Sequence, residues 1–122
     1  MILVDTSVWV DHLRHGVPKL ADLLEETQVL GHPAVLGEIA LGSLAHRAEV
    51  LNLLGDLPQA MSASDAEVLT LIGYRQIFGR GIGYVDAQLL TSTMITPDAR
   101  LWTRDTRLAE VATELGCAVA LR

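Results

Sequence analysis

Apolar residues along the chain fall into short unbroken runs that are separated by longer stretches with helical spacing. The first run, Ile2 to Val4, has no polar alternation, which predicts a strand buried on both faces. Similar short segments follow at residues 28–30, 101–103 and 118–121, and residues 58–61 form either a weaker strand or a loop. These segments are the candidate strands of the protein.

Helical periodicity fills the intervals between these strands. The predicted helices cover residues 6–15, 19–26, 33–42, 46–54, 64–78, 84–93 and 107–115. Gly16 is placed to end the first helix, and Ser64 with Glu67 has the spacing of a capping box. Because strands and helices alternate, we expect an α/β fold. Residues 1–122 would form a single domain, with a short central parallel sheet of about five strands flanked by helices on both faces.

The N-terminal strand ends in a carboxylate, Asp5, which is followed by Thr6 and Ser7. We expect Thr6 or Ser7 to cap the helix that follows, because a hydroxyl oxygen can accept from the free N–H groups of a first turn. In open α/β sheets, ligands bind at the carboxyl ends of the strands. Asp5 is therefore a candidate functional residue.

Three further acids have similar settings. Asp105 follows the strand at 101–103, while Glu38 and Asp86 lie on helical segments rich in Leu, Ile and Val. Taken alone, two of these acids have a structural explanation: Asp105 can cap a helix, and Asp86 can interact with a helix dipole. Together with Asp5 they can meet at one edge of the sheet. Four carboxylates at one point repel one another unless a cation lies between them. Mg²⁺ and Mn²⁺ are the cations that suit carboxylate ligands.

Composition narrows the class of protein. Half of the 122 residues are hydrophobic, yet the apolar runs are far shorter than the roughly 20 residues that cross a bilayer, and the N-terminus has no signal-peptide pattern. We therefore expect no membrane association, and the surplus apolar surface suggests a protein partner. The lone Cys117 excludes an internal disulfide and fits a reducing cytoplasm. His12, His15, His32 and His46 lack metal-binding spacing and are expected on the surface or in loops.

The net charge of −6 argues against a protein that coats nucleic acid generally. However, residues 75–122 hold six of the nine basic residues, and all six are arginine, whose planar fork suits phosphate. Arg80 and Arg104 are the candidates for holding phosphates that flank the acids. The glycine-rich loop 79–83 lacks the Lys-Ser/Thr of a P-loop and is interpreted as a mobile connection beside Asp86.

The acids and their neighbours resemble a known family. The segments that carry the resemblance are Asp5-Thr6-Ser7, Val35-Leu36-Gly37-Glu38-Ile39, Gly83-Tyr84-Val85-Asp86-Ala87 and Leu101-Trp102-Thr103-Arg104-Asp105. In this order they look like a PIN domain and, more narrowly, the VapC toxins of bacterial toxin–antitoxin pairs. The resemblance covers nearly the whole chain. It implies that Asp5, Glu38, Asp86 and Asp105 bind metal, while Thr6, Ser7 and Thr103 order them.

The resemblance also implies an activity and partners. It implies an endoribonuclease that depends on Mg²⁺ or Mn²⁺, with Asp5 as the central ligand and Asp86 and Asp105 as further ligands. Glu38 would be a ligand or the group that orients and deprotonates the attacking water. The expected partners are an RNA substrate and a cognate, DNA-binding antitoxin of the VapB kind that blocks the acidic site. A homodimer also fits the apolar composition.

Two other functions stay open. An aspartyl-nucleophile phosphatase also places an acid at a strand end, but such enzymes usually carry a second acid two residues later, where this chain has Ser7. A non-catalytic PIN-fold module could keep the fold only to bind a partner. The substitution Asp5→Asn separates the nuclease from the binding module, because a nuclease would lose turnover and a binding module would lose nothing.

Overall fold

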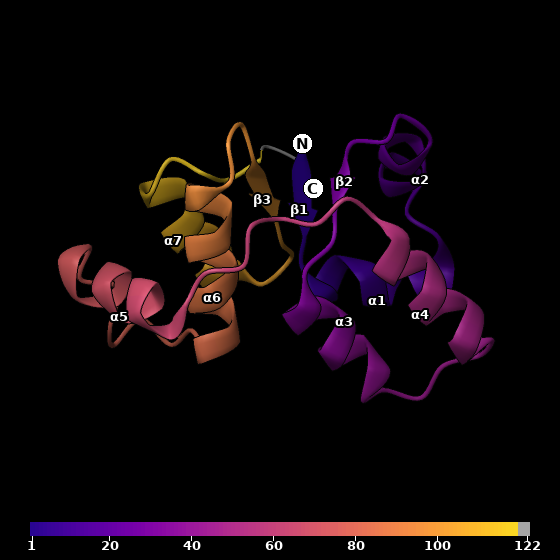
Figure 1. The fold of residues 1–122 in the computed structure, drawn as a ribbon, viewed down its shortest axis with the longest axis horizontal. Coiled ribbons are helices and arrows are strands. Elements are labelled where there is room, and N and C mark those ends of the chain that lie inside the picture. The colour runs from indigo at the N-terminus through magenta and orange to yellow at the C-terminus, as the bar shows by residue number, and fades with distance from the viewer. Residues whose placement is uncertain (120–122) are drawn as a thin grey trace.

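The computed structural model describes residues 1–119, and within them it contains a parallel sheet of three strands. These are β1 (Ile2–Val4), β2 (Val29–Leu30) and β3 (Arg100–Trp102), in the spatial order β2-β1-β3 (Figure 1). β1 pairs with both neighbours, with Leu3 opposite Leu30 on one side and Leu101 on the other. The predicted parallel sheet and its buried first strand are confirmed.

The two remaining predicted strands contribute single bridges within the described part of the chain. Gln59 bridges Gly31 beside β2, and Ala118 bridges Leu101 of β3, both in the parallel sense. Segment 58–61 therefore pairs at one position only. The predicted strand at 118–121 is described to residue 119, and its end lies outside the described residues.

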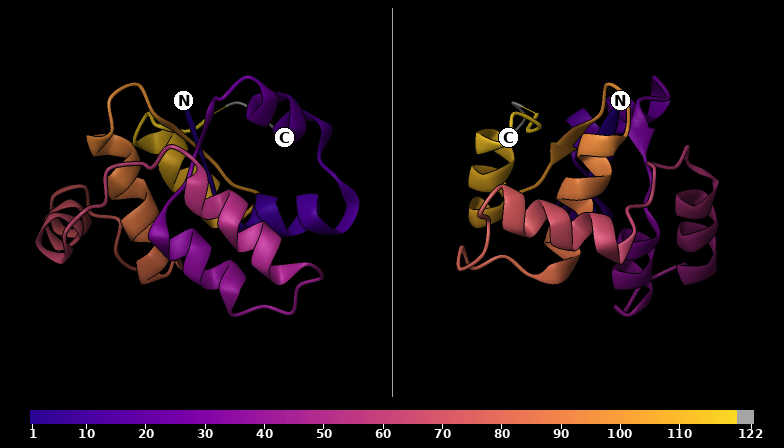
Figure 2. Two further views of the ribbon diagram at one scale, coloured as in Figure 1. Left: turned by 45° about the vertical axis from the view of Figure 1, so that its right-hand side comes forward. Right: turned by 60° about the vertical axis from the view of Figure 1, so that its left-hand side comes forward.

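Helices connect the strands, as the alternation predicts. Within residues 1–119 they are α1 (Thr6–His15), α2 (Pro18–Glu25), α3 (Pro33–Ala40), α4 (Arg47–Asp56), α5 (Asp65–Tyr74), α6 (Tyr84–Ile95) and α7 (Thr106–Glu114). Helices α1 to α4 lie on the β2 side of the sheet, and α5 to α7 lie on the β3 side (Figures 1 and 2). α5 ends at Tyr74, earlier than predicted, where Gln76 adopts a positive φ of 53°.

The helix ends follow local chemistry. Gly16, with φ +74°, ends α1 as predicted. Ser64 and Glu67 form the predicted capping box, in which Ser64 Oγ accepts from the Glu67 N–H at 3.1 Å and Glu67 Oε1 accepts from the Ser64 N–H at 2.9 Å. These short-range bonds depend on residues near in sequence, which is why the pattern could predict them.

The hydrophobic core is built on the sheet. Leu3, Val4, Leu101 and Trp102 of β1 and β3 have at most 1% of their surface exposed. Helices contribute other buried residues to the same cluster, namely Val8, Leu20, Leu89, Leu90, Leu108 and Val111. Cys117 is buried and free, as expected of a small core residue. None of the helices in residues 1–119 has the length and apolar character that spanning a membrane requires.

Candidate active site at the carboxyl ends of β1 and β3

The paired strands β1 and β3 end side by side. The Asp5 N–H donates to the Trp102 carbonyl at 2.9 Å, so Asp5 and Thr103 both follow directly from the edge of the sheet. The chain passes from β1 to β2 on one side and then to β3 on the other. The carboxyl end of β1 is therefore a topological switch point, where open parallel sheets bind their ligands.

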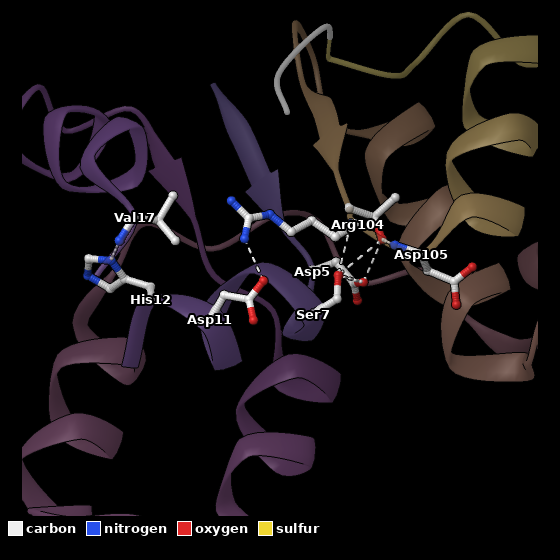
Figure 3. Close-up of polar contacts among 8 residues, drawn as sticks. Asp5, Ser7, Asp11, His12, Val17, Arg104 and Asp105 are labelled. Atoms are coloured by element: carbon white, nitrogen blue, oxygen red, sulfur yellow. Dashed lines mark hydrogen bonds and ion pairs between the residues drawn. The ribbon is translucent and has the colours of Figure 1, made fainter. Parts of the chain in front are cut away.

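Asp5 is held there by two hydroxyl groups. Only 6% of its surface is exposed, and its Oδ2 accepts from Ser7 Oγ at 2.8 Å and from Thr103 Oγ1 at 2.7 Å. Each hydroxyl also accepts a backbone N–H: Ser7 from Arg104 at 3.0 Å, and Thr103 from Asp105 at 3.1 Å (Figure 3). Within residues 1–119 no hydrogen bond reaches Asp5 Oδ1. The network therefore fixes the carboxylate and leaves one oxygen for a ligand.

The prediction that Thr6 or Ser7 caps α1 is wrong. Asp5 occupies the N-cap position and makes no side-chain cap bond, while Thr6 and Ser7 lie inside the first turn. The Ser7 hydroxyl donates to Asp5, and the Thr6 hydroxyl donates to Glu38 Oε1 on α3 at 2.6 Å. Because Asp5 takes the N-cap position, Thr6 and Ser7 are already helical residues, and their hydroxyls donate to the carboxylates of Asp5 and Glu38.

Asp86 and Asp105 also have local contacts. Asp86 lies in the first turn of α6, and its Oδ2 accepts from the Gly83 N–H at 3.0 Å. Asp105 caps α7, since its Oδ1 accepts from the N–H groups of Arg107 at 2.9 Å and Leu108 at 3.1 Å. The predicted capping role of Asp105 is therefore confirmed, and Asp86 lies in a first helical turn, where its charge can interact with the helix dipole as predicted. In each acid these hydrogen bonds use one carboxylate oxygen, so they do not exclude a ligand role.

The four acids share one electrostatic environment. Burial raises the pKa of Asp86, the hydrogen bond from Gly83 opposes that shift, and the negative charges of the other three acids raise it further. Within residues 1–119, however, no three side chains of His, Cys, Asp or Glu converge closely enough to hold an ion between them. The acids are thus neighbours at one edge and do not form a closed cage.

Both predicted phosphate-binding arginines have acidic partners. Arg80 makes two bonds to Glu114 of α7, at 2.7 and 2.9 Å. Arg104 pairs with Asp11 of α1, as Figure 3 shows. To bind a phosphate, each guanidinium would have to share these bonds or break them. Their role in substrate binding stays a prediction.

His32 lies in the loop between β2 and α3, which agrees with the expectation that the histidines lie on the surface or in loops, but its side chain is buried. It has 4% of its surface exposed and caps α3, with Nδ1 accepting from the Ala34 N–H at 3.0 Å. Its Nε2 lies 2.9 Å from Ser92 Oγ on α6. A signal was present in the sequence, because a polar residue directly before Pro33 occupies the position of a helix cap.

Comparisons with known proteins place the chain in a family. A scan against protein-family models finds no match. Among curated proteins, Ribonuclease VapC32 of Mycobacterium tuberculosis, in strains H37Rv and CDC 1551, is 49% identical to this chain over 120 residues. The alignment covers 98% of this chain and 97% of the relative. At that identity over nearly the full length of both proteins, the chain belongs to the VapC family of PIN-domain ribonucleases.

Proposed function

We propose that this protein is the toxin of a type II toxin–antitoxin pair and that it hydrolyses RNA phosphodiester bonds with Mg²⁺ or Mn²⁺ bound by Asp5, Glu38, Asp86 and Asp105. One observation carries the proposal. At the switch point of a parallel sheet, a buried carboxylate is fixed through Oδ2 by two hydroxyls, and no hydrogen bond within residues 1–119 reaches its Oδ1. The relatives named above are ribonucleases.

The residues present fit a hard divalent cation. All four proposed donors are carboxylates, which Mg²⁺ and Mn²⁺ prefer. The raised pKa of Asp86 reflects burial and the neighbouring negative charges, which a cation would relieve. Mg²⁺ commonly takes only one or two carboxylates directly and keeps several waters. Within residues 1–119 no three acids are close enough to bind one ion together, which agrees with this preference of Mg²⁺ for few direct carboxylate ligands.

The chain's own residues would prepare the reaction. Ser7 and Thr103 fix the orientation of Asp5, so this carboxylate needs no reorganisation when substrate arrives. Thr6 holds Glu38 at the solvent-exposed side, where Glu38 can orient a water molecule and accept its proton. A bound divalent cation would supply a more acidic water and neutralise charge on the phosphate.

The proposal includes the finer points of architecture and partners. We propose one domain over residues 1–122 with about five strands, because one core cluster spans the chain and both weaker segments bridge the sheet.

We also propose that the protein is cytoplasmic, that it forms a homodimer, and that it binds a VapB-like antitoxin, which itself binds DNA. Exposed apolar side chains such as Leu41, Leu53 and Tyr74 support contact with other chains. Co-expression with the antitoxin should give one complex on a sizing column, and separate migration would contradict it.

The test is cleavage of a labelled, structured RNA pool in Mn²⁺, in Mg²⁺ and in EDTA. The wild type should cut only with metal, and Asp5→Asn should lose at least about 100-fold in rate. Asp22→Asn, which neutralises an exposed acid on α2, is the matched control and should cut normally. A folded Asp5→Asn variant that cuts like the wild type would overturn the assignment. Hydrolysis of a phosphomonoester without cleavage of RNA would favour the phosphatase instead.

A further inference from the structure

The loop before α6 carries a glycine that makes room for an arginine. Gly81 has φ +78°, a conformation that favours glycine, and it lies against the side chain of Arg107 from α7. A Cβ built on Gly81 would come within 2.6 Å of Arg107 Nη1 and 3.0 Å of its Cδ. A side chain at residue 81 would therefore require the Arg107 side chain to move from its present position.

The position of Arg107 relates it to two of the acids. It lies in the first turn of α7, and its N–H donates to the capping Oδ1 of Asp105 at 2.9 Å. Gly81 is close in sequence to Gly83, whose N–H donates to Asp86 at 3.0 Å. The Arg107 side chain thus connects the helix start held by Asp105 with the loop that contacts Asp86.

The charge of Arg107 is not matched by an acid in the part of the chain that the structure describes. The ion pairs within residues 1–119 join Arg80 to Glu114 and Arg104 to Asp11. Arg107 is exposed, and no side-chain hydrogen bond or ion pair is found for it within the same residues. Its guanidinium therefore keeps its full charge and its planar set of donors for a ligand.

We propose that Arg107, positioned by Gly81, binds a phosphate of the RNA beside the acids. This inference rests on the proposed function and adds a substrate contact to it. A guanidinium can bind a phosphate through two parallel N–H bonds, which fixes orientation as well as adding charge. The site is otherwise acidic, so an unpaired cation at its rim supplies the attraction that a polyanionic substrate needs.

The experiment measures RNA binding without cleavage. A fluorescent single-stranded RNA of mixed sequence is titrated with Asp5→Asn protein in EDTA, at several salt concentrations, by fluorescence anisotropy. Arg107→Gln in this background should weaken binding about 10-fold and lower the slope of log K against log salt by about 0.7. Arg75→Gln, which neutralises another exposed arginine, at the end of α5, should leave the slope unchanged.

Two further variants separate position from charge. Gly81→Ala keeps every charge but forces the Arg107 side chain to move, so it should weaken binding in the same direction. Arg107→Lys keeps the charge without the fork and should fall between the wild type and Arg107→Gln. In the active protein, Arg107→Gln should raise KM more than it lowers kcat.

The outcomes distinguish this inference from the proposed function. Equal, small effects of Arg107→Gln and Arg75→Gln on binding would overturn the inference, even if the wild type cuts RNA. Loss of binding specific to Arg107→Gln would support it, even if no cleavage were found with any metal. Melting curves of each variant exclude unfolding as the cause.

Discussion

His32 links three segments of the fold and makes stability sensitive to pH. Its Nδ1 accepts from the Ala34 N–H at 3.0 Å, so the ring proton must lie on Nε2, which donates to Ser92 Oγ at 2.9 Å. Ser92 Oγ also accepts from the Ala63 N–H at 3.1 Å. The neutral imidazole therefore ties the start of α3 to α6 and to the segment before α5.

Replacing His32 should be costly for stability. His32→Ala removes a helix cap worth about 1 kcal/mol and a hydrogen bond to Ser92 worth about 1 kcal/mol. It also leaves space where a ring with 4% of its surface exposed had been packed, which adds about 1–2 kcal/mol. We expect the free energy of unfolding in urea to fall by about 3–4 kcal/mol. His15→Ala, at an exposed histidine, should change it by less than about 0.5 kcal/mol.

The sign of the pH effect follows from the pKa. Burial lowers the pKa of His32 below its ordinary value of 6.5. Below about pH 6.5 the unfolded chain therefore binds a proton that the folded protein resists, so stability falls as the pH falls. The slope for one such group is at most about 1.4 kcal/mol per pH unit. A proton on Nδ1 would also remove the acceptor for the Ala34 N–H.

The assay compares urea unfolding of the wild type and His32→Asn between pH 7.5 and 5. Asn can still cap α3 but does not titrate, so the acid-side loss of stability should become shallower. Asp86, whose raised pKa gives a slope of the opposite sign, is present in both proteins and cancels in the difference. Identical pH slopes for the two proteins would refute the reasoning about His32.

Other predictions test the core, a cap and the acidic edge. Leu3→Ala, at a residue with 0% exposure in the central strand, should lower the free energy of unfolding by about 2–5 kcal/mol in urea. Ser64→Ala breaks the capping box of α5 and should cost about 1 kcal/mol, measured as a lower Tm. Asp86→Asn should raise the Tm of metal-free protein at pH 7.5, because the raised pKa means that the fold disfavours the ionised carboxylate. A lower Tm for this last variant would contradict the electrostatic argument.

The sequence by itself determined the elements and the positions of the four acids along them. An unbroken apolar run at Ile2–Val4 can only be buried on both faces, and Asp5 then follows the strand by covalent connection. The C-terminal end of α1 and the start of α5 were predictable for the same reason, because Gly16 and the Ser64–Glu67 pair act on backbone groups within a few residues. These features depend on short-range chemistry that a linear pattern records.

The tertiary structure alone decided which side chains meet. The bond from Thr103 to Asp5 joins residues 98 positions apart, and that from Thr6 to Glu38 joins residues 32 positions apart. The packing of the helices against one another also buried His32 against Ser92. It paired Arg80 and Arg104 with acids and brought the Arg107 side chain against Gly81. A hydroxyl or a guanidinium can bind many partners, so its choice depends on which elements the core packs together, and the sequence pattern does not record that choice.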